Sequence, residues 1–227
     1  MSRRILVFTV AYTVLIISPA LLSQQFGLYP LTKTGDMTDI LTPLVLIPLY
    51  WMLFSLDRPP TQRETVIFLV LAALWAEGQG IHLGANSIGH LLGSTRDTDV
   101  FALTHFYDEV LGHYLWHIGV FALTGLLIWR QWRTPFIGTS ASLRPEIAAA
   151  VIYGLVYFIT VDEAGTALLG IPFATVVVIV GLIGRKQLRQ QPVTAFFFAA
   201  HLLALALFLI WFLRWGGLPQ FSELGWI

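Results

Sequence analysis

Long runs of apolar residues, separated by short polar segments, dominate the chain. A helix that crosses a membrane needs about 20 mostly apolar residues, within a range of about 17–25. The pattern therefore predicts an all-α polytopic integral membrane protein, built as a single transmembrane helical domain over residues 1–227. We expect a bundle of about seven transmembrane helices, at residues 5–22, 40–56, 65–92, 101–129, 147–169, 171–183 and 193–213.

Turn-forming and charged residues separate most of these runs, as Asp57-Arg58-Pro59-Pro60 does after the second. Between the fifth and sixth runs only Gly170, Ile171 and Pro172 intervene, which allows a tight hairpin with residues on either side completing the spans. The first run is long for the apolar region of a signal peptide, and Ser23-Gln24-Gln25 is a poor cleavage site. We therefore expect this run to be retained as the first helix.

The composition agrees with a membrane environment. Hydrophobic residues make up 56% of the chain and charged residues 11%, against a usual charged share of about 25%. The formal net charge is zero, which indicates no nucleic-acid partner, and the absence of cysteine excludes disulfides and thiolate metal sites. Membrane lipids are the expected surroundings, and the sequence identifies no protein partner.

Positive charges alternate between the two sides of the predicted bundle. With the N-terminus inside, ten of the thirteen Lys and Arg residues fall in cytoplasmic segments, and three, Lys33, Arg96 and Arg214, fall in outer ones. Such a cytoplasmic excess is the positive-inside rule. A missed or extra helix would scramble the alternation, so we expect a cytoplasmic N-terminus, an outer C-terminus and a location in the inner (plasma) membrane of the cell.

Ionisable side chains gather in the third predicted helix. Five of the six histidines lie between His82 and His117, although ionisable groups at membrane depth cost about 2.5–3.5 kcal/mol each on insertion scales. His82, Asn86 and His90 are spaced by four and follow one helix face. Glu77 would lie roughly 140° from His82 on a regular helix. The intervening glycines allow a kink or a close approach of helices, so the spacing alone does not decide whether Glu77 joins the cluster.

The fourth predicted helix carries a second polar stripe. His105, Glu109, His113 and His117 are spaced by four, so neighbours along the stripe lie about 5–6 Å apart at Cβ. Asp108 points about 100° to one side and is able to reach a neighbouring helix. The predicted topology places this stripe, the stripe on the third helix and the pair Asp162-Glu163 in the outer half of the bilayer.

This convergence predicts a metal centre. Imidazole and carboxylate ligands suit a divalent zinc or iron ion. We expect ligands among His82, His113, His117, Glu109, Glu77 and Glu163, with Glu109 and Asp108 as the residues that carry catalysis. Three histidines with an open position would activate a zinc-bound water for hydrolysis, whereas more carboxylates would suit a di-iron oxidase. Either enzyme would act on a lipid-like or other membrane-soluble substrate.

Other functions use the same residues. Chains of His, Asp and Glu in a membrane also build proton relays, so a proton or ion transporter is the first alternative. A non-catalytic subunit of a membrane complex, with a structural polar core, is the second. Haem between two histidines is disfavoured by the nearby carboxylates, and a retinal-type Schiff base by the location of Lys33 and Lys186 in loops.

Seven helices with an inner N-terminus, the pair His113-xxx-His117, the acid Asp108 and His82 together resemble the superfamily of intramembrane zinc hydrolases that includes alkaline ceramidases and progestin/adipoQ receptors. The resemblance implies an intramembrane zinc site formed by these residues. The order along the chain differs, because the histidine pair of that superfamily lies on the last helix, where this chain offers His201. The resemblance is therefore one of chemistry and covers a few residues.

Overall fold

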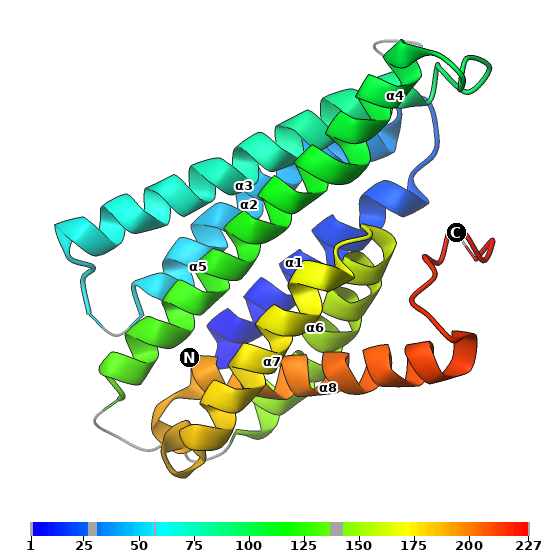
Figure 1. Ribbon diagram of the computed structural model, residues 1–227. Coiled ribbons are helices and arrows are strands. Elements are labelled where there is room, and N and C mark those ends of the chain that lie inside the picture. The colour runs from blue at the N-terminus through cyan, green and yellow to red at the C-terminus, as the bar shows by residue number, and fades with distance from the viewer. Residues whose placement is uncertain (1, 27–30, 57, 137–142, 227) are drawn as a thin grey trace.

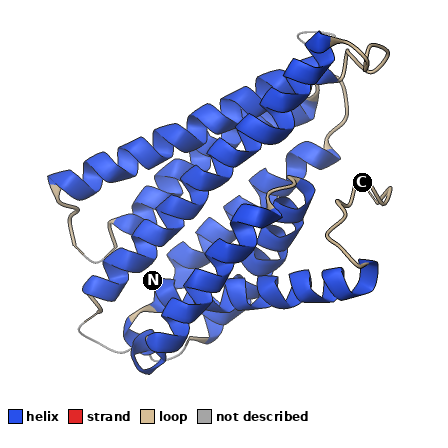
Figure 2. Ribbon diagram, viewed as in Figure 1, coloured by secondary structure: helices blue, strands red, loops and turns tan. Residues whose placement is uncertain are grey.

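The computed structural model describes residues 2–26, 31–56, 58–136 and 143–226. Helices form nearly all of the regular structure in these residues (Figures 1 and 2). In chain order they are α1 (Ser2–Leu21), α2 (Thr34–Phe54), α3 (Gln62–Gly89), α4 (Asp99–His105), the π-helix η1 (Phe106–Gly112), α5 (His113–Arg133), α6 (Arg144–Glu163), α7 (Ala167–Ile183), the 3-10 helix η2 (Arg185–Gln190) and α8 (Pro192–Trp215).

Six helical stretches in the described residues are long and apolar enough to cross a membrane. They are α1, α2, α3, the continuous stretch from α4 to α5, α6 and α8, while α7 is apolar but shorter, with 17 residues. Large apolar side chains point outward along them, and Leu44, Val70 and Ile210 are each more than half exposed. Lipid is the natural solvent for such a surface. The predicted all-α polytopic membrane protein is confirmed.

The helices close into a ring. Along this ring α1 contacts α2, α2 contacts α3, and α3 contacts α5. The ring continues from α5 to α7, from α7 to α8 and from α8 to α6, which contacts α1 again. Figure 1 shows α2, α3 and α5 running together, with α1, α6, α7 and α8 beside them. The connections α1–α2, α3–α4 and α6–α7 lie at one end of the bundle, which is the end that the charge pattern predicts to face outward.

The turn between α6 and α7 differs from the expected one. The chain reverses at Ala164, Gly165 and Thr166, because Gly165 adopts a φ of 63°, a left-handed conformation that glycine reaches without steric cost. Gly170 and Pro172, which we expected in the connection, lie inside α7. Glu163 is consequently the last residue of α6, next to the turn.

A π-helical segment interrupts the fourth predicted span. The helix runs from Asp99 to Arg133, but residues 106–112 form η1. A π turn holds more residues than an α turn, so the side chains after it are rotated relative to an ideal α-helix. Asp108 becomes buried, whereas His105 stays exposed. The regular stripe expected from spacing by four is therefore broken within this segment.

Three glycines bring α3 and α5 unusually close together. A Cβ at Gly119 would lie 2.6 Å from the backbone nitrogen of Trp75, and a Cβ at Gly112 would lie 2.8 Å from that of His82. A Cβ at Gly78 would collide with the backbone of Trp116. Small residues at a helix interface permit this backbone-to-backbone packing in membranes.

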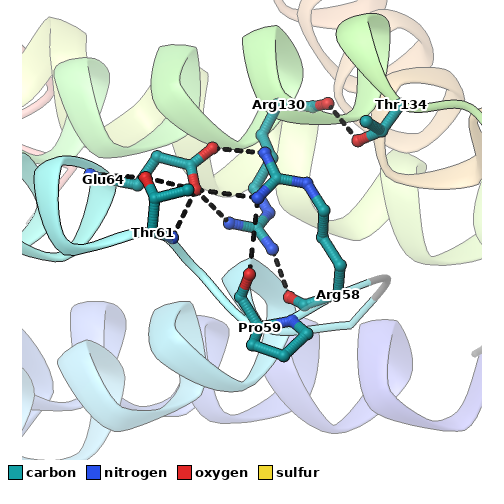
Figure 3. A network of polar contacts seen from close by, with 6 residues as sticks. All are labelled: Arg58, Pro59, Thr61, Glu64, Arg130 and Thr134. Carbon is teal, nitrogen blue, oxygen red and sulfur yellow. Dashed lines mark hydrogen bonds and ion pairs between the residues drawn. The ribbon is translucent and has the colours of Figure 1, made fainter.

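A buried ionic network ties the α2–α3 connection to the far end of α5 (Figure 3). Glu64 Oε2 accepts hydrogen bonds from Arg130 Nη1 at 3.0 Å and from Arg58 Nη1 at 3.0 Å. The same carboxylate oxygen accepts from the backbone nitrogen of Thr61 at 2.8 Å, and Arg130 also donates to the backbone carbonyl of Arg58. Glu64 and Arg130 are almost fully buried, so the Arg130 charge is compensated by Glu64, and the Glu64 charge by Arg130 and Arg58 together.

Replacing Gly78 by alanine should lower stability by about 1–3 kcal/mol, because the added methyl group overpacks the contact with the backbone of Trp116. Thermal unfolding of the purified protein in detergent measures the loss. Gly80→Ala is the matched control on the same helix, since no heavy atom lies within 4 Å of the Cβ position there. Equal melting temperatures for the two variants would contradict the close contact.

Glu64→Ala should destabilise the fold by about 3–5 kcal/mol, because it leaves the buried Arg130 guanidinium without its carboxylate. Arg63→Ala, which removes an exposed charge one residue earlier, should have little effect. Denaturant unfolding of both variants makes the comparison. A Glu64→Ala protein as stable as Arg63→Ala would show that the network contributes nothing.

Candidate metal centre

Three side chains from neighbouring helical segments meet toward the end of the bundle that the charge pattern predicts to face outward. His82 comes from α3, Asp108 from η1 and His113 from the first residue of α5. One ligand atom from each lies within 4.8 Å of the others. Asp108 and His113 are 8% and 6% exposed, so the group is largely shielded from solvent. We refer to His82, Asp108 and His113 as the triad.

The triad atoms lie within contact distance of one another or of a further acid. His82 Nδ1 lies 2.7 Å from Asp108 Oδ1, the distance of an ion pair, and His113 Nδ1 lies 3.5 Å from Glu109 Oε2. Imidazole nitrogens and carboxylate oxygens that converge in a buried space are the donor atoms that a divalent cation takes. The donor set of the triad therefore fits a metal ion.

A series of polar side chains extends from the second ring nitrogen of His82. Its Nε2 lies 4.0 Å from Asp39 Oδ2 on α2. Asp39 Oδ1 accepts a hydrogen bond of 2.6 Å from Gln79 Nε2, and Gln79 Oε1 accepts one of 3.3 Å from Trp75 Nε1. Metal-binding histidines usually turn their second nitrogen toward such a carboxylate, which fixes the ring and raises its basicity. We had not expected Asp39 and Gln79 at the site.

A cavity of about 510 Å³ borders the triad. His82 and His113 line it, together with Glu109, whose Oε2 lies 3.5 Å from His113 Nδ1. Glu109 is partly exposed, so its carboxylate is accessible from the cavity. A smaller cavity of about 170 Å³ is lined by Asp108, with His105 and His90. Each residue of the triad therefore borders one of two cavities.

His117, an expected ligand, is engaged elsewhere. It is buried, and its Nδ1 lies 2.5 Å from Thr166 Oγ1, which also donates to the carbonyl of Val161 at 3.3 Å. The ring is stacked on Phe121. His117 thereby links α5 to the α6–α7 turn, one helical turn away from the triad. Thr166 is a partner that the sequence pattern did not indicate.

The other expected acids lie in two different environments. Glu163 lines the larger cavity, and its Oε2 accepts a hydrogen bond of 3.1 Å from the backbone nitrogen of Ser222. Its neighbour Asp162 is buried away from the triad. Glu77 is exposed on α3, so the structure does not bring it to the group. Glu163 is therefore close to the site, and Glu77 is separate from it.

The remaining histidines lie outside the triad. His90 lines both cavities, and partial burial, followed by the nearby charge of Lys33, lowers the pKa of its ring. His105 is exposed and stacks on Phe101. His201 is buried on α8, where its Nδ1 lies 2.7 Å from the carbonyl of Phe197 and its ring packs on Tyr157. It is a core histidine.

The donor set of the triad suits a first-row divalent ion. Two imidazoles and one carboxylate are the ligands found in catalytic zinc sites and in non-haem iron sites. In a tetrahedral zinc site with bonds of about 2.0–2.1 Å, ligand atoms lie about 3.4 Å apart. His82 Nδ1 and Asp108 Oδ1, at 2.7 Å, are closer than this, so the pair would have to separate slightly to admit an ion. Three protein ligands also leave room for a water or a substrate at a further position.

Two curated proteins resemble the chain over most of its length. It is 28% identical over 213 residues to ceroid-lipofuscinosis neuronal protein 6 of Homo sapiens, a match that covers 81% of this chain and 65% of that protein. It is 26% identical over 210 residues to the ceroid-lipofuscinosis neuronal protein 6 homolog of Canis lupus familiaris, with the same coverage of each chain. The chain thus spans 65% of the length of these relatives. No family model matches, and no solved structure matches.

The fold and this likeness agree on one functional conclusion. The chain is an integral membrane protein with a polar cluster set among its helices. The names of the two relatives state no substrate and no reaction. The chemistry of the site has to be argued from its own residues.

Proposed function

We propose that the protein is a metal-dependent membrane enzyme whose divalent ion, zinc or iron, is held by His82, Asp108 and His113. The observation that carries this proposal is the buried convergence of one ligand atom each from His82, Asp108 and His113 within 4.8 Å of one another. The support of His82 by Asp39 and Gln79 adds to it.

The site favours a reaction on a membrane-soluble, lipid-like substrate. When bound, a zinc ion would act as a Lewis acid and lower the pKa of a coordinated water. Glu109 faces the same cavity and lies beside His113, so it is placed to accept a proton from a water or a substrate there. The wall contributed by α1 and α6 is largely apolar, which suits an acyl or alkyl chain.

The orientation and the membrane belong to the same proposal. The alternation of positive charges supports a cytoplasmic N-terminus in the inner (plasma) membrane. In that orientation the triad and the larger cavity lie toward the outer leaflet. A substrate would then enter from the outer face or laterally from the outer leaflet.

Elemental analysis of the purified protein tests the metal. We expect about one equivalent of zinc or iron per chain, because the described residues form one such triad. A His82→Ala, His113→Ala double variant should lose it. His105→Ala, an exposed histidine on the same helical stretch, should retain it. Folded wild-type protein without stoichiometric metal, including after incubation with zinc or ferrous iron, would contradict the proposal, and proton flux in liposomes would then test the transporter.

Asp39→Asn should weaken metal binding by about 10–100-fold without removing a ligand, because the amide orients and polarises His82 less well than the carboxylate. Competition with a chelator of known affinity measures the change. Asp36→Asn is the matched control one turn earlier on α2, where the carboxylate accepts from the backbone nitrogen of Lys33 instead. Its metal affinity should stay unchanged, and an equal loss in both variants would rule out a specific role of Asp39.

A further inference from the structure

The larger cavity combines an apolar wall with an acidic interior. Ile16, Ile17 and Leu21 of α1 and Ile159 of α6 contribute the apolar side. Trp116 of α5 also lines the cavity, and its ring centroid lies 5.9 Å from that of His82 and 6.1 Å from that of His113. The cavity therefore offers a hydrophobic surface for a chain and a polar end next to the candidate metal centre.

Carboxylates outnumber cations inside this cavity. Asp36 and Lys33 lie together at the beginning of α2, where Asp36 Oδ2 accepts from the backbone nitrogen of Lys33 at 2.8 Å. Asp39, Glu109 and Glu163 also line the cavity, and no other Lys and no Arg does so among the described residues. Asp39 accepts a hydrogen bond from Gln79, Glu109 lies beside His113, and Glu163 accepts from the backbone of Ser222, so the neighbour named for each acid is neither a lysine nor an arginine. The three carboxylates therefore give the cavity a negative character that favours a positively charged occupant.

A bound metal ion would not remove this imbalance. As metal ligands, His82 and His113 would be neutral, because imidazole binds metals in its neutral form. A divalent ion would bring two positive charges, against four negative charges from Asp108 and the three cavity acids. Four minus two leaves two negative charges, which a positively charged occupant would help to balance.

We propose that the cavity binds a cationic amphiphile, a molecule with one long alkyl chain that ends in an ammonium group. The ammonium would lie among Asp39, Glu109 and Glu163 and against the ring of Trp116, since tryptophan is the best cation–π partner. The alkyl chain would lie along Ile16, Ile17 and Ile159. The inference rests on the proposed function, because it names the substrate class of the same site.

Photo-crosslinking in nanodiscs of zwitterionic lipid tests this inference. The probe is hexadecylamine with a diazirine in its chain, compared with hexadecanoic acid and hexadecanol that carry the same group. We expect the amine to label α1 between residues 16 and 22 and the acid to label this segment at least about tenfold less. Equal labelling by all three probes would show partition into lipid and would overturn the proposal.

Three variants sharpen the result. Glu109→Gln with Glu163→Gln should reduce labelling by the amine about tenfold, because the ammonium loses two of its counter-charges. Glu77→Gln is the control, since Glu77 is an exposed acid outside the cavity. An amine attracted by Glu77 would lie in the surrounding lipid, so this variant should leave labelling of the cavity unchanged. Ile17→Trp, which narrows the cavity without changing its charge, should reduce labelling as well. Labelling lost in Glu77→Gln but kept in the other two proteins would overturn the proposal.

Metal analysis of the same samples separates the two ideas. Labelling of α1 in a wild-type protein that contains no metal would support the cationic ligand and contradict the metal-dependent function. Stoichiometric metal in a protein that shows no preference for the amine would support the metal centre and contradict the cationic ligand. A second equivalent of zinc that displaces the amine from Glu109 and Glu163 would identify a second metal ion as the occupant, and would also overturn it.

Discussion

The close contact between α3 and α5 is the constraint on which the candidate site depends. Gly78, Gly112 and Gly119 let the backbones touch where any larger residue would hold them apart. This contact sets His82 beside Asp108 and His113. A helix pair separated by ordinary side chains would leave these groups too distant to share an ion. The geometry of the triad therefore depends on these three glycines, because their lack of a side chain allows the helices to approach.

The fold was largely predictable from the sequence because lipid imposes simple rules. A chain in a bilayer must satisfy its backbone within helices, and long apolar runs therefore predict the spans. Helix boundaries were less predictable, since Gly165 and not Gly170-Pro172 makes the turn before α7. Nothing in hydropathy distinguishes two nearby glycines, because the deciding factor is the backbone conformation that packing imposes on one of them.

The candidate site was predictable in location but only partly in membership. His82, Asp108 and His113 follow from the density of ionisable residues in two neighbouring helices. His117 shares their spacing but contacts Thr166, because the α6–α7 turn, which is distant in sequence, packs against α5 at this position. Asp39 was missed for a related reason, since its pairing with Gln79 and His82 depends on how α2 packs against α3.

The π-helical segment has a consequence for how such a site arises. A π turn is what one inserted residue produces in an existing α-helix, and π segments occur frequently at functional sites. The π geometry of residues 106–112 rotates Asp108 relative to the flanking turns, while the helical stretch as a whole stays long and apolar enough to cross the membrane. One inserted codon in the gene for a regular transmembrane helix would thus be enough to turn a carboxylate toward a neighbouring helix.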